Sequence, residues 1–352
     1  MRRKAAERRR QGWPITGVML SGANGAHKLA AVRNHPWSPS LVATARFALR
    51  RSGNSGRMAT NTSSPRRPAA HRLAQRVEEL TALDGPAEAV AGAVRGKLPP
   101  GALKDALSGS WLGHALHPLL TDIPIGAWTS ATLLDVLGRD DDRPAASRLV
   151  ATGIVSAVPT AVSGLSDWSD TTLSDPAAGR VGVVHAVANT MALALYTASW
   201  CARRSGDHGR GVRLGLAGAA ALGAGGFLGG HLSYVRGVGV DQTAFEQPSE
   251  EWVDVAADAD LIESELHAGS ADGVEVVVTR VGGEVCALAD RCTHRGGPLH
   301  EGTLLDGCVE CPWHGSRFRL ADGSLERGPA AYPQPAYETR VRDGRVEVRT
   351  KP

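Results

Sequence analysis

Long apolar stretches dominate the middle of the chain. There are four of them, at residues 112–138, 149–166, 181–202 and 212–234. At a rise of about 1.5 Å per helical residue, the third is roughly 33 Å long, which matches a bilayer core of about 30 Å. The second and fourth stretches lack the polar face that each helix of a water-soluble bundle needs. The pattern therefore predicts a four-span membrane domain over residues 111–238.

After residue 249 the pattern changes to short alternating runs. The runs cover residues 274–279, 286–288, 307–310, 337–341 and 345–349. Alternation with period two, interrupted by glycine-containing turns, is typical of strands with one buried face. We therefore expect a small all-β domain over residues 250–350. The predicted fold class is multidomain, with an all-α four-helix transmembrane bundle followed by this all-β domain.

The N-terminal part of the chain divides into two segments. Residues 76–110 show the modest apolar spacing of an amphipathic helical segment, which could lie on a membrane surface or pack against the next domain. Residues 1–75 are predicted to be a basic extension without regular structure. Residues 1–57 carry twelve lysines and arginines but one acidic residue, and Met58 opens a more ordinary start. We expect translation to start there, with a basic tail or a targeting segment as the alternatives.

Composition excludes several classes of protein. The 352 residues include 42 glycines without a Gly-X-Y period or sustained heptads, so the chain is neither collagen nor a coiled coil. The basic N-terminal segment has few aromatic residues and no fold signature, so we expect no nucleic-acid partner. Four of the five cysteines lie between Cys286 and Cys311. This clustering indicates a metal site rather than a disulfide framework.

Two Cys/His pairs stand in the middle of the predicted β domain. They are Cys292-Thr-His294 and Cys311-Pro-Trp-His314, separated by 16 residues. Each pair places one thiolate and one imidazole on the same tight turn. Glycines and prolines that permit and stiffen such turns flank both pairs: Gly296, Gly297, Pro298, Pro312 and Gly315.

This donor set favours iron and sulfide over a single metal ion. Two thiolates on one iron and two neutral imidazoles on another give an asymmetric [2Fe-2S] centre whose potential exceeds that of an all-cysteine cluster. Zinc needs the same atoms, but zinc modules usually carry more uniform spacings and lack such loops. Cys286 and Cys308 lie outside the motif in strand-like runs, and we expect them to pack in the core.

Residues 250–350 resemble a Rieske domain over their whole length. The resemblance implies that Cys292 and Cys311 bind the inner iron of one cluster and that His294 and His314 bind the iron nearer solvent. An exposed edge of these two histidines would pass single electrons. Arg295, His300 and Arg317 would shape the docking surface around it.

Departures from the respiratory type of Rieske protein place the domain nearer the ferredoxins. That type carries a loop disulfide where this chain has Gly297 and Trp313, and a tyrosine where it has Phe318, although Ser316 keeps a neighbouring serine. Fewer hydrogen bonds to the sulfurs imply a low to intermediate potential, toward the low end of roughly −150 to +300 mV.

Residues 110–240 resemble a bacterial family of four-span membrane domains of unassigned function. The matching residues form the motifs His117-Pro118-Leu119-x-x-Asp122-x-Pro124, Gly164-x-x-Asp167-Trp168, His185-x-x-x-Asn189 and Gly230-His231-Leu232. Ionisable groups at membrane depth often mark function. His117, His185 and His231 could therefore bind haem b, take part in quinone or proton chemistry, or hydrogen-bond neighbouring helices.

Together these features predict a membrane-anchored electron-transfer protein. A redox sensor or scaffold, and a haem- or quinone-linked oxidoreductase subunit, are the alternatives. No catalytic constellation is visible, so an electron carrier or oxidoreductase component is favoured over a stand-alone enzyme. We expect no Rieske oxygenase catalytic subunit, because 38 residues follow His314 and an iron-binding catalytic domain needs more. The expected partners are membrane lipid, a reductase or acceptor protein, and a quinone.

The basic residues near the spans give an ambiguous orientation. Seven arginines on one side against five basic residues on the other place both termini outside by the positive-inside rule. The missing loop disulfide instead suits a reducing compartment. We therefore expect a multi-pass protein of the cell inner membrane with the Rieske domain in the cytoplasm.

Overall fold

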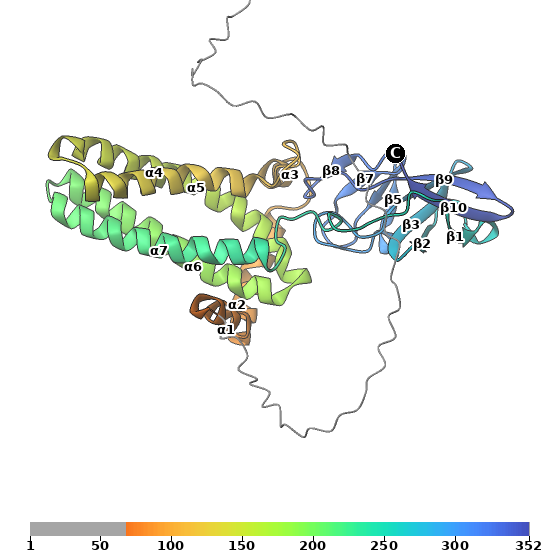
Figure 1. Ribbon diagram of the computed structural model, residues 1–352, viewed down its shortest axis with the longest axis horizontal. Helices are drawn as coiled ribbons and strands as arrows, with labels where there is room; N and C mark the ends of the chain where they lie inside the picture. The colour runs from red at the N-terminus through yellow and green to blue at the C-terminus, as the bar shows by residue number, and fades with distance from the viewer. Residues whose placement is uncertain (1–67, 352) are drawn as a thin grey trace, which may run out of the picture. The chain divides into compact units, whose positions relative to one another are not determined.

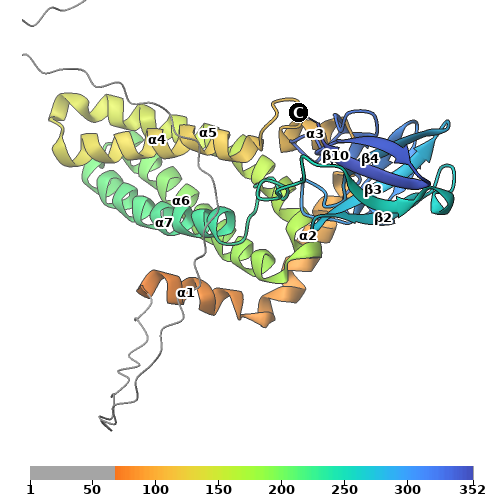
Figure 2. The ribbon, with the colours of Figure 1, turned by 45° about the vertical axis from the view of Figure 1, so that its right-hand side comes forward.

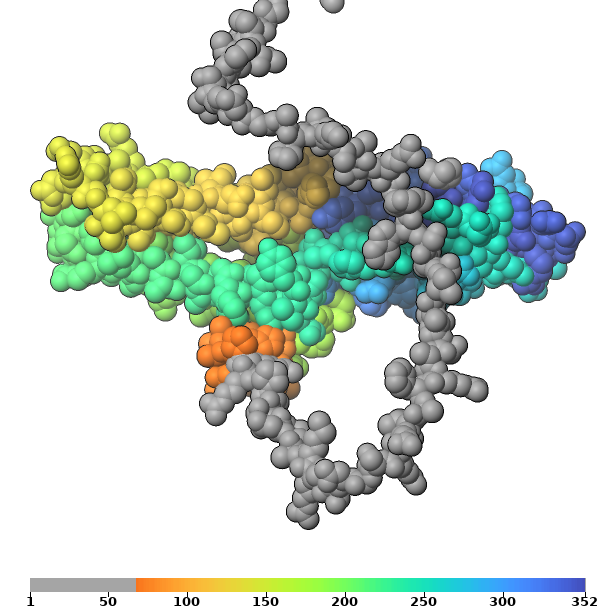
Figure 3. Space-filling model, in the orientation of Figure 1, coloured from red at the N-terminus to blue at the C-terminus, as the bar shows by residue number. Residues whose placement is uncertain are grey.

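The computed structural model describes residues 68–351. Most of the basic extension, including the start expected at Met58, lies outside these residues. The first helix begins at Ala69, inside the segment that we expected to lack regular structure. It forms because Ala74 and Val77 are buried against Val181 and Leu228 of two of the long helices. Figure 3 shows this helix, in orange, lying against the green helices.

Helices occupy the described chain up to Tyr234. They are α1 (Ala69–Glu78), α2 (Asp84–Lys97), α3 (Ala102–Ser108), α4 (Leu116–Leu137), α5 (Arg143–Ser174), α6 (Pro176–Arg204) and α7 (His208–Tyr234). Helices α2 and α3 lie in the predicted amphipathic segment, which takes in only the last three residues of α1, and the last four helices correspond to the four apolar stretches. Short 3₁₀ turns precede α2 and α5.

The four long helices form two hairpins. Helix α4 lies beside α5, and α6 beside α7, as Figures 1 and 2 show. Among the described residues, three segments are long and apolar enough to cross a membrane, at 140–174, 176–204 and 208–234. Helix α4 is not among them, since Asp122, Asp135 and His117 interrupt its apolar sequence.

Large aromatic side chains pack against glycines between these helices. Because glycine has no Cβ, an aromatic ring can lie directly on the backbone of the neighbouring helix. The three pairs are Trp128 on Gly153, Trp168 on Gly182 and Tyr196 on Gly218. The Trp128 and Tyr196 rings are also stacked, with centroids 4.3 Å apart. The glycine-rich sequence thus gives close helix packing.

The C-terminal part of the chain is a β domain of three antiparallel sheets. Their strand orders are β1-β10-β9, β2-β3-β4 and β5-β6-β7-β8. The strands are β1 (Val253–Ala257), β2 (Leu266–Ala271), β3 (Val274–Val281), β4 (Glu284–Ala289), β5 (Thr303–Leu305), β6 (Cys308–Glu310), β7 (Arg317–Arg319), β8 (Leu325–Arg327), β9 (Tyr337–Arg342) and β10 (Arg345–Thr350).

All five predicted runs coincide with strands, namely β3, β4, β6, β9 and β10. The sequence missed β1, β2, β5, β7 and β8. The last three have three residues each, too few for a visible alternation, and β2 contains a glycine and no β-branched residue. Two apolar cores fill the domain. One joins the first two sheets around Val276 and Val346, and the other surrounds Phe318 and Leu299 and contains Cys292.

Replacing Gly153 by alanine tests the aromatic–glycine packing. A methyl group there would overlap the Trp128 indole, so overpacking should destabilise the protein by about 1–3 kcal/mol. Gly126 on α4 is the matched control, because nothing lies within 4 Å of an added Cβ. Thermal unfolding in detergent should show a lower Tm for Gly153→Ala than for Gly126→Ala. Equal melting temperatures would contradict the packing argument.

Candidate metal centre

Two loops of matching backbone geometry carry the paired Cys/His residues. One follows β4 and the other joins β6 to β7. In the first, Gly296 N–H donates to the Cys292 carbonyl at 2.8 Å, and in the second, Gly315 N–H donates to the Cys311 carbonyl at 3.1 Å. Both glycines have positive φ, +77° and +74°. The chain therefore needs glycine at these two positions to close each loop.

The two loops approach each other closely at Gly297. A Cβ on this residue would lie 3.0 Å from the Cys311 sulfur and equally near the Trp313 indole. Cys292 N–H donates to the Gly297 carbonyl at 2.9 Å, which fixes the first loop against this contact. A side chain at Gly297 would push the loops apart.

The thiols of Cys292 and Cys311 are buried, free and hydrogen-bonded to each other. Both residues are at most 3% exposed. The hydrogen bond from Cys292 raises its own pKa and lowers the pKa of Cys311, whose thiolate also accepts from the backbone N–H groups of Trp313 and His314. A sulfur that is stabilised as thiolate is suited to bind metal.

The two imidazoles lie together beside the thiols. The ring centroids of His294 and His314 are 4.9 Å apart, with an interplanar angle of 89°. His314 Nε2 lies 3.0 Å from the Asp170 carbonyl oxygen. Because that oxygen only accepts, Nε2 carries the proton, which leaves the lone pair of Nδ1 free for a metal. His294 Nδ1 is buried and has no hydrogen-bond partner within the described chain.

Burial keeps both imidazoles neutral. It lowers the pKa of His294 well below the ordinary value and lowers the pKa of His314 as well. The neutral ring is the form that binds metal. Two thiols in contact and two neutral imidazoles, one with an unpartnered buried nitrogen, fit a [2Fe-2S] cluster.

The donors are grouped in pairs rather than around one point. Within residues 68–351, no three His, Cys, Asp or Glu side chains are arranged to hold a single metal ion. A two-iron cluster requires two protein ligands on each iron, with sulfide ions completing each coordination shell. The zinc alternative needs four donors around one ion.

The edge that carries both imidazoles is covered, so the expectation of an exposed histidine edge is wrong. The His294 side chain is 15% exposed, and His314 is 8% exposed. Asp170 near the end of α5 covers them, with its Oδ2 atom 3.6 Å from His294 Nε2. The sequence placed α5 in the membrane and gave no sign that its end contacts the β domain.

The three polar residues expected to form a docking surface are bonded within the chain. Arg295 donates to Ser174 Oγ at 3.3 Å, His300 Nδ1 lies 2.8 Å from Asp290 Oδ2, and Arg317 Nε lies 2.5 Å from Glu310 Oε2. They therefore brace the two loops and their contact with α5.

Sequence reasoning missed three residues of the site. Asp170 and Lys104 form an ion pair of 3.0 Å beside the imidazoles, and each side chain is 4% exposed. Gln334 is 2% exposed, accepts from Thr293 N–H at 3.1 Å, and donates to the Ala289 carbonyl at the end of β4 and to the Arg291 carbonyl beside the first loop. A charge near the end of an apolar helix was the available signal for Asp170.

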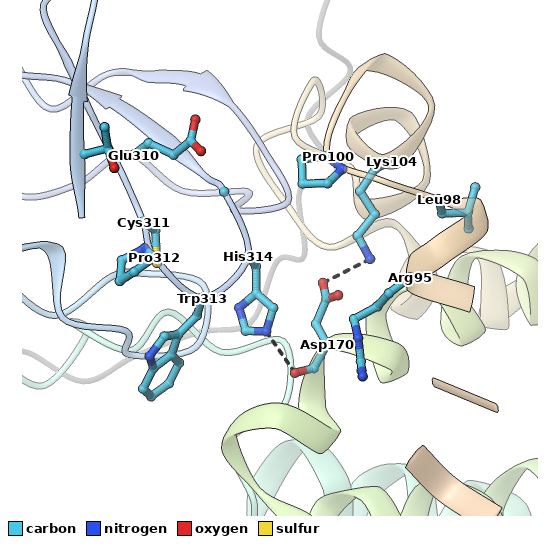
Figure 4. Close-up of a pocket in the computed structure, with 12 residues that line it drawn as sticks. Arg95, Leu98, Pro100, Lys104, Asp170, Glu310, Cys311, Pro312, Trp313 and His314 are labelled. Carbon is cyan, nitrogen blue, oxygen red and sulfur yellow. Dashed lines mark hydrogen bonds and ion pairs between the residues drawn. The ribbon is translucent and has the colours of Figure 1, made fainter. Parts of the chain in front are cut away.

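A cavity of about 470 Å³ opens beside the second loop. Cys311, Trp313 and His314 form one wall, and Arg95 and Lys104 lie on the opposite side, as Figure 4 shows. The Trp313 side of the cavity is open, since this residue is 41% exposed. The lining of the cavity therefore places an aromatic ring and two cationic side chains next to the candidate metal centre.

The histidines of the long helices bond to neighbouring elements. His117 Nδ1 lies 3.0 Å from the Thr160 carbonyl and His185 Nδ1 lies 2.8 Å from the Gly225 carbonyl. His231 Nε2 lies 2.8 Å from a carboxylate oxygen of Glu78. These contacts agree with the expectation that the histidines hydrogen-bond neighbouring helices, and haem b is not supported.

Cys308 is buried and Cys286 is half-buried against the core, as expected.

A β domain in which two Cys/His loops pair their thiols and their imidazoles defines a Rieske-type iron–sulfur protein. The chain belongs to the Rieske [2Fe-2S] family, whose domain model matches residues 251–338. Residues 113–242 match a second family, described as a predicted membrane protein (DUF2231).

Similar proteins include ferredoxins. The anthranilate 1,2-dioxygenase ferredoxin subunit of Burkholderia cepacia is 37% identical over 28% of this chain and 91% of its own length. Ferredoxin CarAc of Metapseudomonas resinovorans is 34% identical over 28% of this chain and 92% of its own. A similar solved structure is the ferredoxin of carbazole 1,9a-dioxygenase from Nocardioides aromaticivorans IC177, which is 31% identical in sequence. The match covers 28% of this chain and 98% of the ferredoxin, with a TM-score of 0.28.

These findings establish the cofactor and the general role. The chain carries a Rieske [2Fe-2S] cluster and is an electron carrier fused to a domain of a predicted membrane protein family. Its multidomain fold, with a helical part followed by a small β domain, agrees with the fold class predicted from sequence.

Replacing Gln334 by leucine should loosen the first loop. The change leaves the buried Thr293 N–H without an acceptor and two carbonyls without a donor, so we expect a cost of about 1–3 kcal/mol and reduced iron content. Thr339→Val is the control, since it removes a single bond to Val285 away from the loops. Iron analysis and thermal unfolding measure both effects. Full iron content in Gln334→Leu would contradict the bracing role.

Proposed function

We propose that Cys292 and Cys311 bind one iron of the cluster and that His294 and His314 bind the other. Two observations carry this assignment. The two thiols are hydrogen-bonded to each other, and the two neutral imidazoles lie together, one of them with a buried Nδ1 that has no partner in the described chain. A bound [2Fe-2S] cluster supplies one-electron transfer. The loops supply the fixed donors, and the surrounding apolar side chains limit access of water.

We further propose that the helices anchor the carrier in a membrane. The match to a predicted membrane family and the three apolar segments support this. Helix α4 is proposed as the fourth span, because its 22 residues reach about 33 Å. Exposed apolar side chains along α4 suit contact with lipid: Leu119, Ile123, Leu133, Val136 and Leu137.

The proposed location is the cell inner membrane, in several passes, with the β domain in the cytoplasm. The cysteines of the described chain are all free, which suits a reducing compartment. Of the arginines that argued for the opposite orientation, Arg203 is neutralised in a buried ion pair of 2.5 Å with Asp135. This weakens the opposing charge asymmetry.

The proposed partner on the soluble side is a protein reductase or acceptor. The ferredoxin components named above belong to dioxygenase systems, which supports exchange of electrons with another protein. A carrier turns over with such a partner, whereas the alternative, a redox sensor or scaffold, does not. Steady reduction and reoxidation with a ferredoxin reductase separates the two.

A quinone is proposed as the partner on the membrane side. The observation in its favour is the cavity of about 470 Å³, which has Trp313 for ring contact and lies next to His314. Lys104 and Arg95 line the same cavity and provide donors for quinone oxygens.

Replacing Cys292 by serine tests the ligand assignment. We expect loss of the visible bands and of the reduced-state EPR signal, because one thiolate ligand is removed. Cys308→Ser is the matched control, since Cys308 is equally buried but lies outside the two loops. Absorption and EPR spectra before and after dithionite provide the measurement. A normal cluster in Cys292→Ser would refute the assignment.

Replacing Trp313 by alanine tests the quinone proposal. A short-chain quinol should reduce the cluster of the wild-type protein, and the variant should be reduced at least tenfold more slowly with an unchanged EPR spectrum. Trp252→Ala is the control, because Trp252 packs between Arg340 and Arg349 elsewhere in the β domain. Equal rates in both variants, or no reduction of the wild type by quinol, would exclude quinone binding at this cavity.

A further inference from the structure

Asp170 contacts both imidazoles of the candidate metal centre. Its carbonyl oxygen lies 3.0 Å from His314 Nε2, and its carboxylate oxygen Oδ2 lies 3.6 Å from His294 Nε2. One residue of a membrane-domain helix therefore faces the outer nitrogens of both rings. At 32 residues, α5 is about 48 Å long, so its end extends past a bilayer core of about 30 Å.

One nitrogen of the His294 ring lacks a partner at this contact. Within residues 68–351, His294 Nδ1 is buried without a hydrogen-bond partner. A neutral imidazole that binds iron through Nδ1 carries its proton on Nε2. That N–H group would then face the carboxylate oxygen Oδ2 of Asp170, 3.6 Å away. Iron binding thus accounts for the unpartnered Nδ1.

Lys104 supplies the opposite charge at the same place. Its ammonium lies 3.0 Å from Asp170 Oδ2 and donates to the Ser166 carbonyl at 2.8 Å. The residue is 3% exposed, so water screens the pair poorly. Figure 4 shows Lys104 and His314 reaching Asp170 from opposite sides. An anion and a cation of fixed position therefore lie next to the rings.

We propose that Asp170 and Lys104 are positioning residues through which the membrane domain sets the reduction potential of the cluster. The inference rests on the proposed ligand assignment. Reduction adds one negative charge to the cluster, which a nearby carboxylate opposes and a nearby ammonium favours. A carboxylate that faces the N–H group of a ligating imidazole also increases electron donation to the metal and lowers the potential.

The test is an EPR-monitored redox titration of full-length variants in detergent at one fixed pH. Asp170→Asn should raise the midpoint potential, because the variant loses the anion and keeps the ammonium. Lys104→Gln should lower it, because the carboxylate is then uncompensated, whereas Lys104→Arg should keep the wild-type value. Asp135→Asn is the matched control, since it breaks an equally buried pair with Arg203 at the opposite end of the α4–α5 hairpin.

Shifts of opposite sign in Asp170→Asn and Lys104→Gln, with Asp135→Asn unchanged, support the inference. Wild-type potentials in both variants overturn it, even if their melting temperatures fall, because a purely structural contact would lower stability alone. Should Asp170→Asn lose its cluster, the midpoint potentials of the two Lys104 variants test the inference. A lower potential in Lys104→Gln than in Lys104→Arg supports it, and equal potentials overturn it. Absence of a Rieske EPR signal from the wild-type protein would instead refute the proposed ligand assignment.

Discussion

The site depends on one constraint, which is that two separate loops bring a thiol and an imidazole each into the same buried volume. Each loop closes through a glycine of positive φ, and the missing side chain of Gly297 lets the loops touch. Gln334 ties the first loop to the strand before it. Since donors must meet within a few tenths of an ångström to share a cluster, this bracing is as necessary as the donors themselves.

The helical part of the chain uses glycine for a related purpose. Aromatic rings on one helix lie on glycine backbone of the next, so the helices approach closely at these points. Two buried ion pairs join these helices to their neighbours, Asp135 with Arg203 at one end of the α4–α5 hairpin and Asp170 with Lys104 at the other. Both pairs neutralise charge that would otherwise be costly to bury.

Contact between α5 and the imidazoles changes the expected route of electrons. With the histidine edge covered, a soluble partner cannot reach His294 and His314 directly. The cavity lined by Cys311, Trp313 and His314 lies beside the second loop. The proposed quinone partner and the proposed influence of Asp170 on the potential both follow from this covered edge.

The sequence alone determined the chemistry and the order of the parts. The Cys292–His294 and Cys311–His314 spacings indicated the cluster, and the apolar stretches indicated the four long helices, because both signals are local along the chain. It gave β3, β4, β6, β9 and β10 but missed β1 and β2, and it missed β5, β7 and β8, which are too short to show alternation. Only the tertiary structure revealed Asp170 and Lys104 at the imidazoles, since these residues are more than 100 positions from the loops. Their role depends on which surfaces meet, and local periodicity carries no information about such distant contacts.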